Sequence, residues 1–227
     1  MEVSPLIQEM FEAGMHLGYS RTRRHPSTVP FIFANKSRGD VVDLEKTAEL
    51  LEAAMETVRA FAAQGGTILF VGTKPESRNI VRAAAERIAM PFVENRWVGG
   101  TLTNFGEIRK RVNRLVDLQD RKEKNQLVFK TKKERLMLER EIIKLEKNFG
   151  GLVGLAKLPA AIIVIDSLHE DIAVKEARTL NIPIIALANT DANIDLIQHP
   201  VVGNDSSVKS IGFFTKKMTQ AFEQGKA

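Results

Sequence analysis

The stretch TILFVGTKPESRNIVRAAAERIAMPFVEN, residues 67–95, decides the fold class. Residues 67–72 form a continuous apolar run rich in β-branched side chains, which is typical of a strand covered on both faces. Apolar residues at helical spacing over 76–89 predict a helix, and PFVEN predicts a second short strand. Thr73 and Glu76 have the spacing of a capping box for that helix. A strand, a helix and a strand in this order predict a parallel sheet with helices on its faces.

The same alternation returns in the second half of the chain. AAIIVID (160–166) and IPIIALAN (182–189) are further buried-strand patterns, with a helical pattern over 169–180 between them. Further helices are expected over 5–15, over 45–63 and from 205 to 224, and short strands are expected in PFIF (30–33) and VVDL (41–44). The sequence therefore predicts an α/β fold, a parallel-sheet three-layer α/β/α domain.

An inserted segment, residues 105–149, has a different pattern. Its apolar residues repeat at steps of three and four in two runs, namely Ile108, Val112 and Leu115, then Leu138, Ile142, Leu145 and Phe149. Such steps predict two helices with facing apolar seams, and Thr131 with Glu134 has capping-box spacing at the start of the second helix. We expect an antiparallel coiled-coil helical hairpin over 105–149, protruding from a core domain formed by 1–104 and 150–227.

The positive charge of the chain is concentrated in two segments. The hairpin segment holds 14 Lys/Arg and 8 Asp/Glu, whereas the remainder holds 19 and 20, so the hairpin carries the net excess. A second basic segment, residues 16–39, contains five Lys/Arg and no carboxylate. Unpaired positive charge in local concentrations is the footprint of a polyanion-binding protein, although a solvated surface is the simpler alternative.

The composition excludes several classes of site and of protein. The chain has no cysteine, which excludes disulfides and thiolate metal sites. The N-terminus resembles neither a signal peptide nor a transit peptide, and no apolar run approaches the ~20 residues of a membrane span. We expect a soluble cytoplasmic protein.

The segment NRWVGG, 95–100, joins the core to the hairpin and contains the only tryptophan, Trp97. Its glycine pair allows a sharp turn, and a second pair stands at the hairpin exit, 149–155. We favour Trp97 as a packing residue between the hairpin root and the sheet, with stacking on a nucleic-acid base as the alternative.

A search for an active site gives weak candidates. No phosphate-binding GxxxxGK[ST] or GxGxxG motif is present, although VGTK after the first buried strand places Lys74 where it could contact a phosphate. His16, Asp191 and Asp205 could form a zinc or magnesium site. The simpler interpretation of such carboxylates is helix capping.

Several stretches together resemble a known family. They are AGMHLGYSRTRRHPSTVPFIF, ILFVGTK, RWVGGTLTNF, KKERLMLERE, KLEKNFGGL, LPAAIIVID, AVKEARTLNIPIIALANTDAN and GNDSSVKSI, in order from residue 13 to 211. They resemble the bacterial small-subunit ribosomal protein S-two family. The chain departs from the family pattern at Tyr19 and Ser206, where the family has a histidine and an aspartate, and these changes weaken the metal hypothesis.

The resemblance implies a non-catalytic protein of the small ribosomal subunit. It implies binding to small-subunit ribosomal RNA, late assembly, contacts with neighbouring ribosomal proteins and help in docking ribosomal protein S-one, without membrane or DNA partners. The candidate RNA contacts, expected mainly at phosphate and ribose, are Arg21, Arg23, Arg24, Lys36, Arg38, Lys74, Arg96, Asn104, Arg109, Lys110, Arg111 and Arg114. No cofactor is expected unless the zinc or magnesium site exists. The rival hypothesis is an α/β enzyme that binds a phosphorylated metabolite near Lys74.

Overall fold

The computed structural model describes residues 4–36, 39–124, 126 and 131–226, and the side chain of Lys36 is not described. A five-stranded sheet forms its centre, with the strand order β4-β3-β5-β6-β7 and every neighbouring pair parallel. The strands are β3 (Ile68–Val71), β4 (Phe92–Val93), β5 (Ala161–Ile165), β6 (Ile184–Ala188) and β7 (His199–Val202). The predicted parallel sheet is confirmed.

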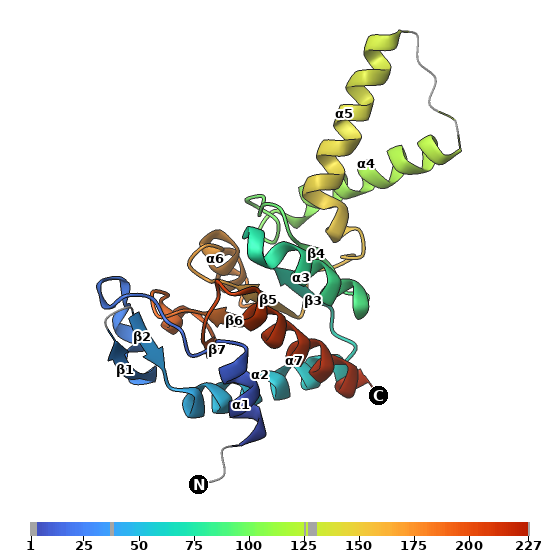
Figure 1. Ribbon diagram of the computed structural model, residues 1–227. Helices are drawn as coiled ribbons and strands as arrows, with labels where there is room; N and C mark the ends of the chain where they lie inside the picture. Colours follow the sequence, from blue (N-terminus) through green and yellow to red (C-terminus); the bar gives the residue numbers. More distant parts are fainter. Residues whose placement is uncertain (1–3, 37–38, 125, 127–130, 227) are drawn as a thin grey trace.

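Helices cover both faces of this sheet (Figure 1). The helices are α1 (Pro5–Glu12), α2 (Leu44–Ala63), α3 (Pro75–Arg87), α4 (Phe105–Glu123), α5 (Lys132–Phe149), α6 (Asp171–Thr179) and α7 (Val208–Lys226). Alternate residues of β3 point to opposite faces: Ile68 and Phe70 belong to a core with α2, α3 and α7, whereas Leu69 and Val71 belong to a core with α6 and the hairpin root. The structure is therefore the three-layer α/β/α domain that the sequence predicts.

The N-terminal segment before α2 is less regular than expected. Pro26–Phe31 forms a 3-10 turn, and the predicted strand in PFIF begins only at Ile32, because Pro30 cannot donate to a strand ladder. Strand β1 (Ile32–Lys36) pairs antiparallel with β2 (Gly39–Val42). Short 3-10 turns also occur at Arg21–Arg23, Gly150–Leu152 and Ile194–Leu196.

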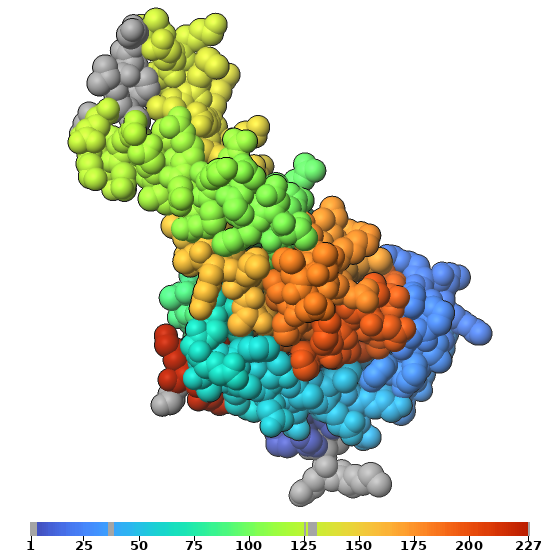
Figure 2. Space-filling view, turned by 180° about the vertical axis from the view of Figure 1, so that it is seen from behind, coloured from blue at the N-terminus to red at the C-terminus, as the bar shows by residue number. Residues whose placement is uncertain are grey.

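Helices α4 and α5 form the predicted hairpin, which projects from the body of the molecule (Figures 1 and 2). The seam residues Val112, Leu115 and Ile142 are buried, so the two helices pack together near the body. Farther out the helices diverge (Figure 1), and Leu136 and Met137 of α5 are exposed there. The side-by-side packing is thus confined to the part of the hairpin nearest the sheet. The division into a core domain and a hairpin domain at residues 105 and 149 stays a prediction.

Candidate nucleic-acid interface

The N-terminal basic loop, residues 16–36, is anchored to the carboxyl edge of the sheet. Thr190, which follows β6, accepts hydrogen bonds at its backbone oxygen from the His25 backbone N–H and the Thr28 hydroxyl, both at 2.8 Å. The Tyr19 backbone N–H donates to the Thr190 hydroxyl at 3.0 Å. These bonds hold the loop against the sheet edge.

Arg24 is turned inward and holds the loop together. Its guanidinium donates two hydrogen bonds to Asp40, one of them from Nε to Oδ2 at 2.6 Å, and Asn35 adds a third donor to that carboxylate at 2.7 Å. The Arg24 guanidinium holds the pKa of the buried Asp40 carboxyl below its usual range. Arg24 therefore acts as a partly buried structural cation.

Arg21 and Arg23 instead lie on the surface of the loop. The side chain of Arg23 is 57% exposed, lies over the Tyr19 ring at 4.1 Å and donates to Asp191 at 2.9 Å. Arg21 is exposed as well. These two arginines can reach a ligand, whereas Arg38 and the side chain of Lys36 lie outside the described residues.

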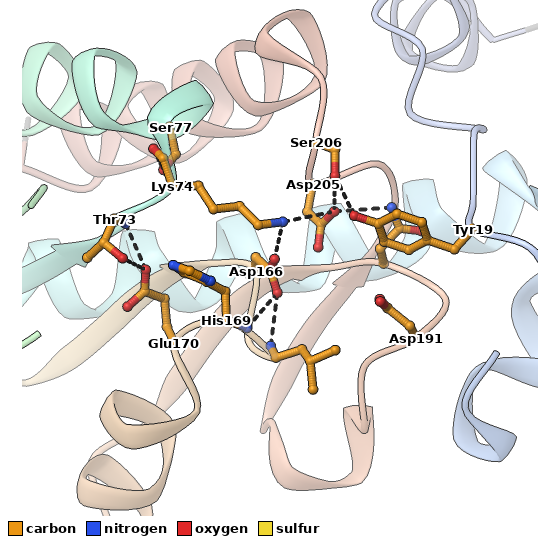
Figure 3. Close-up of polar contacts among 12 residues, drawn as sticks. Tyr19, Thr73, Lys74, Ser77, Asp166, His169, Glu170, Asp191, Asp205 and Ser206 are labelled. Atoms are coloured by element: carbon orange, nitrogen blue, oxygen red, sulfur yellow. Dashed lines mark hydrogen bonds and ion pairs between the residues drawn. The ribbon is translucent and has the colours of Figure 1, made fainter. Parts of the chain in front are cut away.

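Lys74 is enclosed in a cluster of carboxylates at the carboxyl edge of the sheet (Figure 3). Its Nζ forms a close ion pair with Asp166, which follows β5, and lies 3.8 Å from Oδ1 of Asp205, which follows β7. Burial works against the charged ammonium, but the hydrogen bond to Asp166 and the charge of Asp205 outweigh it and raise the pKa of Lys74. A phosphate here would meet two carboxylates, so the geometry favours a structural role for Lys74.

Asp205 is the most deeply buried carboxylate of this cluster. Its Oδ1 accepts from Asn189 at 3.1 Å and from the Ser206 hydroxyl at 3.0 Å, whereas Oδ2 is buried with no hydrogen-bond partner among the described atoms. Burial and the nearby Asp166 charge raise the pKa of Asp205 to about 6, and the Lys74 ammonium offsets this rise only in part. Tyr19 covers the cluster from the N-terminal basic loop through a 2.6 Å hydrogen bond to Ser206 (Figure 3).

The predicted capping box at Thr73 is wrong. The Thr73 backbone N–H and hydroxyl both donate to Oε1 of the buried Glu170, at 2.7 and 2.6 Å, so Thr73 does not cap α3. Lys74 occupies the capping position without a side-chain cap bond. The hydrogen bonds to Glu170 are favoured because they satisfy a buried carboxylate. With its hydroxyl directed at Glu170, Thr73 cannot also cap the helix.

The predicted metal site at His16, Asp191 and Asp205 is also not formed. Among residues 4–36, 39–124, 126 and 131–226, no three His, Cys, Asp or Glu side chains form a group that could hold a metal ion. The His16 ring stacks on Phe11 at a centroid distance of 4.4 Å, whereas Asp191 pairs with Arg23 and Asp205 lies beside Lys74. The three side chains therefore contact three different residues and do not converge on one point.

His16 belongs instead to an apolar pocket on the surface. The pocket has a volume of about 300 Å³, and Phe11, Phe33 and Val41 contribute to its lining. The side chains of Phe11 and Phe33 are 60% and 76% exposed. Exposed aromatic side chains around a pocket are typical of a surface that another molecule covers.

At the root of the hairpin, one carboxylate organises the stretch 96–104. Glu176 of α6 accepts hydrogen bonds from the Trp97 indole at 3.0 Å and from the backbone N–H groups of Gly100 and Leu102 at 2.7 and 2.9 Å. It also accepts from the backbone N–H and the hydroxyl of Thr103, both at 3.1 Å. Burial raises the pKa of Glu176, but these donors outweigh it and the pKa is lowered.

Glu176 is a positioning residue that the sequence analysis missed. A signal was available, because Ala173, Val174 and Ala177 mark the buried face of the helix and Glu176 falls on the same face. A carboxylate on a buried helix face requires donors from another segment. Arg96 and Asn104, at the two ends of the stretch that Glu176 organises, are exposed.

The cations of α4 are mostly engaged within the protein. Arg109 donates to the backbone oxygens of Val153 and Leu155, at 3.4 and 2.9 Å. Exposed ion pairs join Lys110 to Glu107 at 2.5 Å, Arg114 to Glu141 at 3.3 Å and Arg121 to Asp117 at 2.9 Å. Arg111 is exposed and, within the described part of the chain, has no ion pair. Among the residues that the structure describes, Arg111 is the one α4 candidate without a partner.

Comparisons with known proteins agree with the resemblance seen in the sequence. A profile of the family described as Ribosomal protein S2 matches residues 10–225. The chain is 40% identical over 219 residues to small ribosomal subunit protein uS2 of Nocardia farcinica, covering 96% of this chain and 77% of the relative. It is 42% identical over 221 residues to the protein of that name from Sulfurimonas denitrificans, covering 97% and 85%.

Similarity at this level extends over nearly the whole chain. The protein of the same name from Corynebacterium diphtheriae is 42% identical over 222 residues, covering 97% of this chain and 83% of the relative. In the described ranges, no helix combines the length and apolar character needed to cross a membrane. The five-stranded α/β/α domain and the match over residues 10–225 establish that the chain belongs to the ribosomal protein S2 family.

Proposed function

We propose that this chain, as a structural constituent of the small ribosomal subunit, binds small-subunit ribosomal RNA mainly through phosphate and ribose contacts. The family match over residues 10–225 carries this proposal. Lys and Arg side chains displace counterions from phosphates, which makes the affinity dependent on salt. Because an A-form helix hides its base edges in a deep, narrow groove, backbone contacts should dominate. This role is structural rather than catalytic.

The exposed candidates are the best contacts on physical grounds. Arg21 and Arg23 in the loop, Arg96 and Asn104 at the hairpin root, and Arg111 on α4 are exposed. The ion pairs of Lys110 and Arg114 lie at the surface, where a pair contributes only ~0–1 kcal/mol, so a phosphate can replace the carboxylate. Arg24, Lys74 and Arg109 have internal partners and act by holding the loop, the sheet edge and the hairpin in position.

The test uses binding of the full chain to a small-subunit ribosomal RNA transcript at several salt concentrations. A double Arg21→Gln, Arg23→Gln variant should bind more weakly, with a salt slope smaller by about 0.7–0.9 per lost contact. Arg87→Gln, which removes one charge, is the control. Arg87 is also exposed, and both Arg87 and its ion-pair partner Glu223 lie far from the basic loop in the sequence. An unchanged slope in the double variant would remove the loop from the interface.

We also propose that the chain supports docking of ribosomal protein S-one, with the apolar pocket as the surface. The high exposure of Phe11 and Phe33 supports contact with a protein, and Asp43 and Glu45 add negative charge to the pocket lining. Phe33→Ala should reduce association of S-one with small subunits that contain the variant. Val29→Ala is the control, because Val29 is 50% exposed and does not line the pocket. Equal retention of S-one by both variants would contradict the proposal.

A further inference from the structure

Helix α5 has two chemically different sides. Leu138, Ile142 and Leu145 face the α4 seam, where Ile142 and Leu145 are buried and Leu138 packs against the core. At 3.6 residues per turn, the opposite side is formed by seven exposed residues. They are Lys133, Leu136, Met137, Arg140, Ile143, Lys144 and Lys147, and together they are called the outer face of α5. This face contains four cations, three apolar side chains and no carboxylate.

The cations of this face are all without an ion pair among the described residues, whereas several of those on α4 are paired. No ion pair within the described ranges involves Lys133, Arg140, Lys144 or Lys147. By contrast, the α4 cations Lys110, Arg114 and Arg121 each lie within 4 Å of a carboxylate. A cation without a carboxylate within ion-pair distance attracts a polyanion more strongly than a paired cation does.

We propose that the outer face of α5, rather than α4, is the principal RNA-binding surface of the hairpin, with Lys133, Arg140, Lys144 and Lys147 on phosphates. The proposal rests on the proposed RNA-binding function and assigns it to a helix on which the sequence analysis placed no contact. Charge complementarity selects the ligand class, because four cations without a carboxylate match a phosphate backbone. Leu136, Met137 and Ile143, with exposures of 47%, 62% and 64%, provide apolar contacts for ribose between the phosphates.

The outer face of α5 becomes less favourable for phosphate near the hairpin root. A groove of about 490 Å³ lies there, and its lining includes Ile143, the cations Lys147 and Arg82, and the carboxylates Glu86, Glu94 and Glu146. Arg82 pairs with Glu86 and Glu94, but the three carboxylates outnumber the two cations. These carboxylates make the root end less favourable for a phosphate than the outer part of the helix. Lys133, Arg140 and Lys144 should therefore contribute more to binding than Lys147.

The test compares two variants of the full chain that lose the same charge. The first replaces the four outer-face cations by glutamine (K133Q, R140Q, K144Q, K147Q). The second replaces four ion-paired cations that the proposed function does not place at the RNA (R87Q, R121Q, R135Q, K175Q), and two of them, Arg121 and Arg135, lie on the same hairpin. Binding to a small-subunit ribosomal RNA transcript is measured against salt concentration. The outer-face variant should lose about 3 units of salt slope, at roughly 0.7–0.9 per phosphate contact, and the paired-cation variant less than about 1.

Each other outcome has a distinct meaning. An equal loss in both variants, or a larger loss in the paired-cation variant, overturns the outer-face assignment and leaves RNA binding intact. If the wild-type chain itself shows no salt-dependent binding to the transcript, the proposed function fails as well. If the outer-face variant binds the transcript normally but fails to enter small subunits that lack this protein, the face belongs to a protein partner, which overturns the inference. Circular dichroism of both variants checks that the helices still form.

Discussion

The indole Nε1 of Trp97 donates a hydrogen bond of 3.0 Å to Oε1 of Glu176, and this bond joins the hairpin root to α6. The two residues are 79 positions apart in the chain. Trp97 is 6% exposed and Glu176 is 8% exposed, so the bond lies inside the protein. The packing interpretation of Trp97 therefore agrees with the structure, and the indole also has a specific polar partner.

Trp97→Ala should lower the free energy of unfolding by about 3–5 kcal/mol, the range for truncating a large buried aromatic side chain. Trp97→Phe keeps most of the ring and removes the donor, so it should cost about 1.5–3 kcal/mol, as expected for a hydrogen bond to a charged group. Urea unfolding measures both values. A red-shifted and readily quenched Trp97 emission from the folded wild-type protein would instead show that the ring is exposed.

Gly100→Val should disturb the hairpin root far more than Gly99→Val. The φ of Gly100 is +89°, a conformation that a β-branched residue resists, and a Cβ there would lie 3.1 Å from Cβ of Asn104. A Cβ at Gly99 would have no heavy atom within 4 Å. We expect a loss of about 1–2 kcal/mol or more for the first variant from backbone strain.

The second variant should change stability by less than about 0.5 kcal/mol. Thermal unfolding compares the two, and Trp97 fluorescence reports whether the root has moved. Equal destabilisation by both substitutions would show that the left-handed conformation of Gly100 is not what the root requires.

Removing the hairpin should leave a folded α/β domain. A variant in which a short glycine linker replaces residues 106–148 keeps all five strands of the central sheet and the contact between Trp97 and Glu176. It should unfold cooperatively at a lower temperature than the full chain, because Ile108 and Leu145 belong to the same core as Leu69 of β3. A broad, non-cooperative thermal transition would show that the hairpin is part of the folding unit.

The regular elements could be predicted because their signals are local. The apolar runs at 67–72, 160–166 and 182–189 each contain a strand of the parallel sheet, and the three- and four-residue steps locate both hairpin helices. The sequence analysis missed strand β7 because its sequence, HPVV, is short and contains Pro200. Proline is tolerated in an edge strand such as β7, but it does not predict a strand.

The site could be predicted only in part, because side-chain pairing depends on segments far apart in the chain. Sequence reasoning grouped Arg21, Arg23 and Arg24 as equivalent cations, yet Arg24 faces inward to Asp40. Lys74 was expected at a phosphate, and its partner Asp166 lies 92 positions later in the chain. Neither pairing has a local signature. The first forms only when the loop folds back onto β2, and the second only when β3 and β5, from the two halves of the chain, lie side by side.

The buried carboxylate Asp205 should make stability depend on pH in an unusual direction. Its pKa rises from 3.8 to about 6 in the folded protein, so the folded state binds this proton more tightly than the unfolded state. The stability that this group contributes is therefore fully present below about pH 4 and is lost as the pH rises through 6. Asp205→Asn removes the titration and keeps an oxygen for the donors Asn189 and Ser206.

The measurement is urea unfolding of the wild type and of Asp205→Asn at pH 4.5, 6 and 7.5. The wild type should lose more stability than the variant across this range, because its ionised Asp205 is buried beside Asp166 while Lys74 compensates only in part. Asp195→Asn, at an exposed carboxylate, is the control and should follow the wild-type profile. Parallel profiles for the wild type and Asp205→Asn would mean that Asp205 does not titrate in this window. The Lys74 ammonium would then balance the buried charges of Asp166 and Asp205 more completely than their distances suggest.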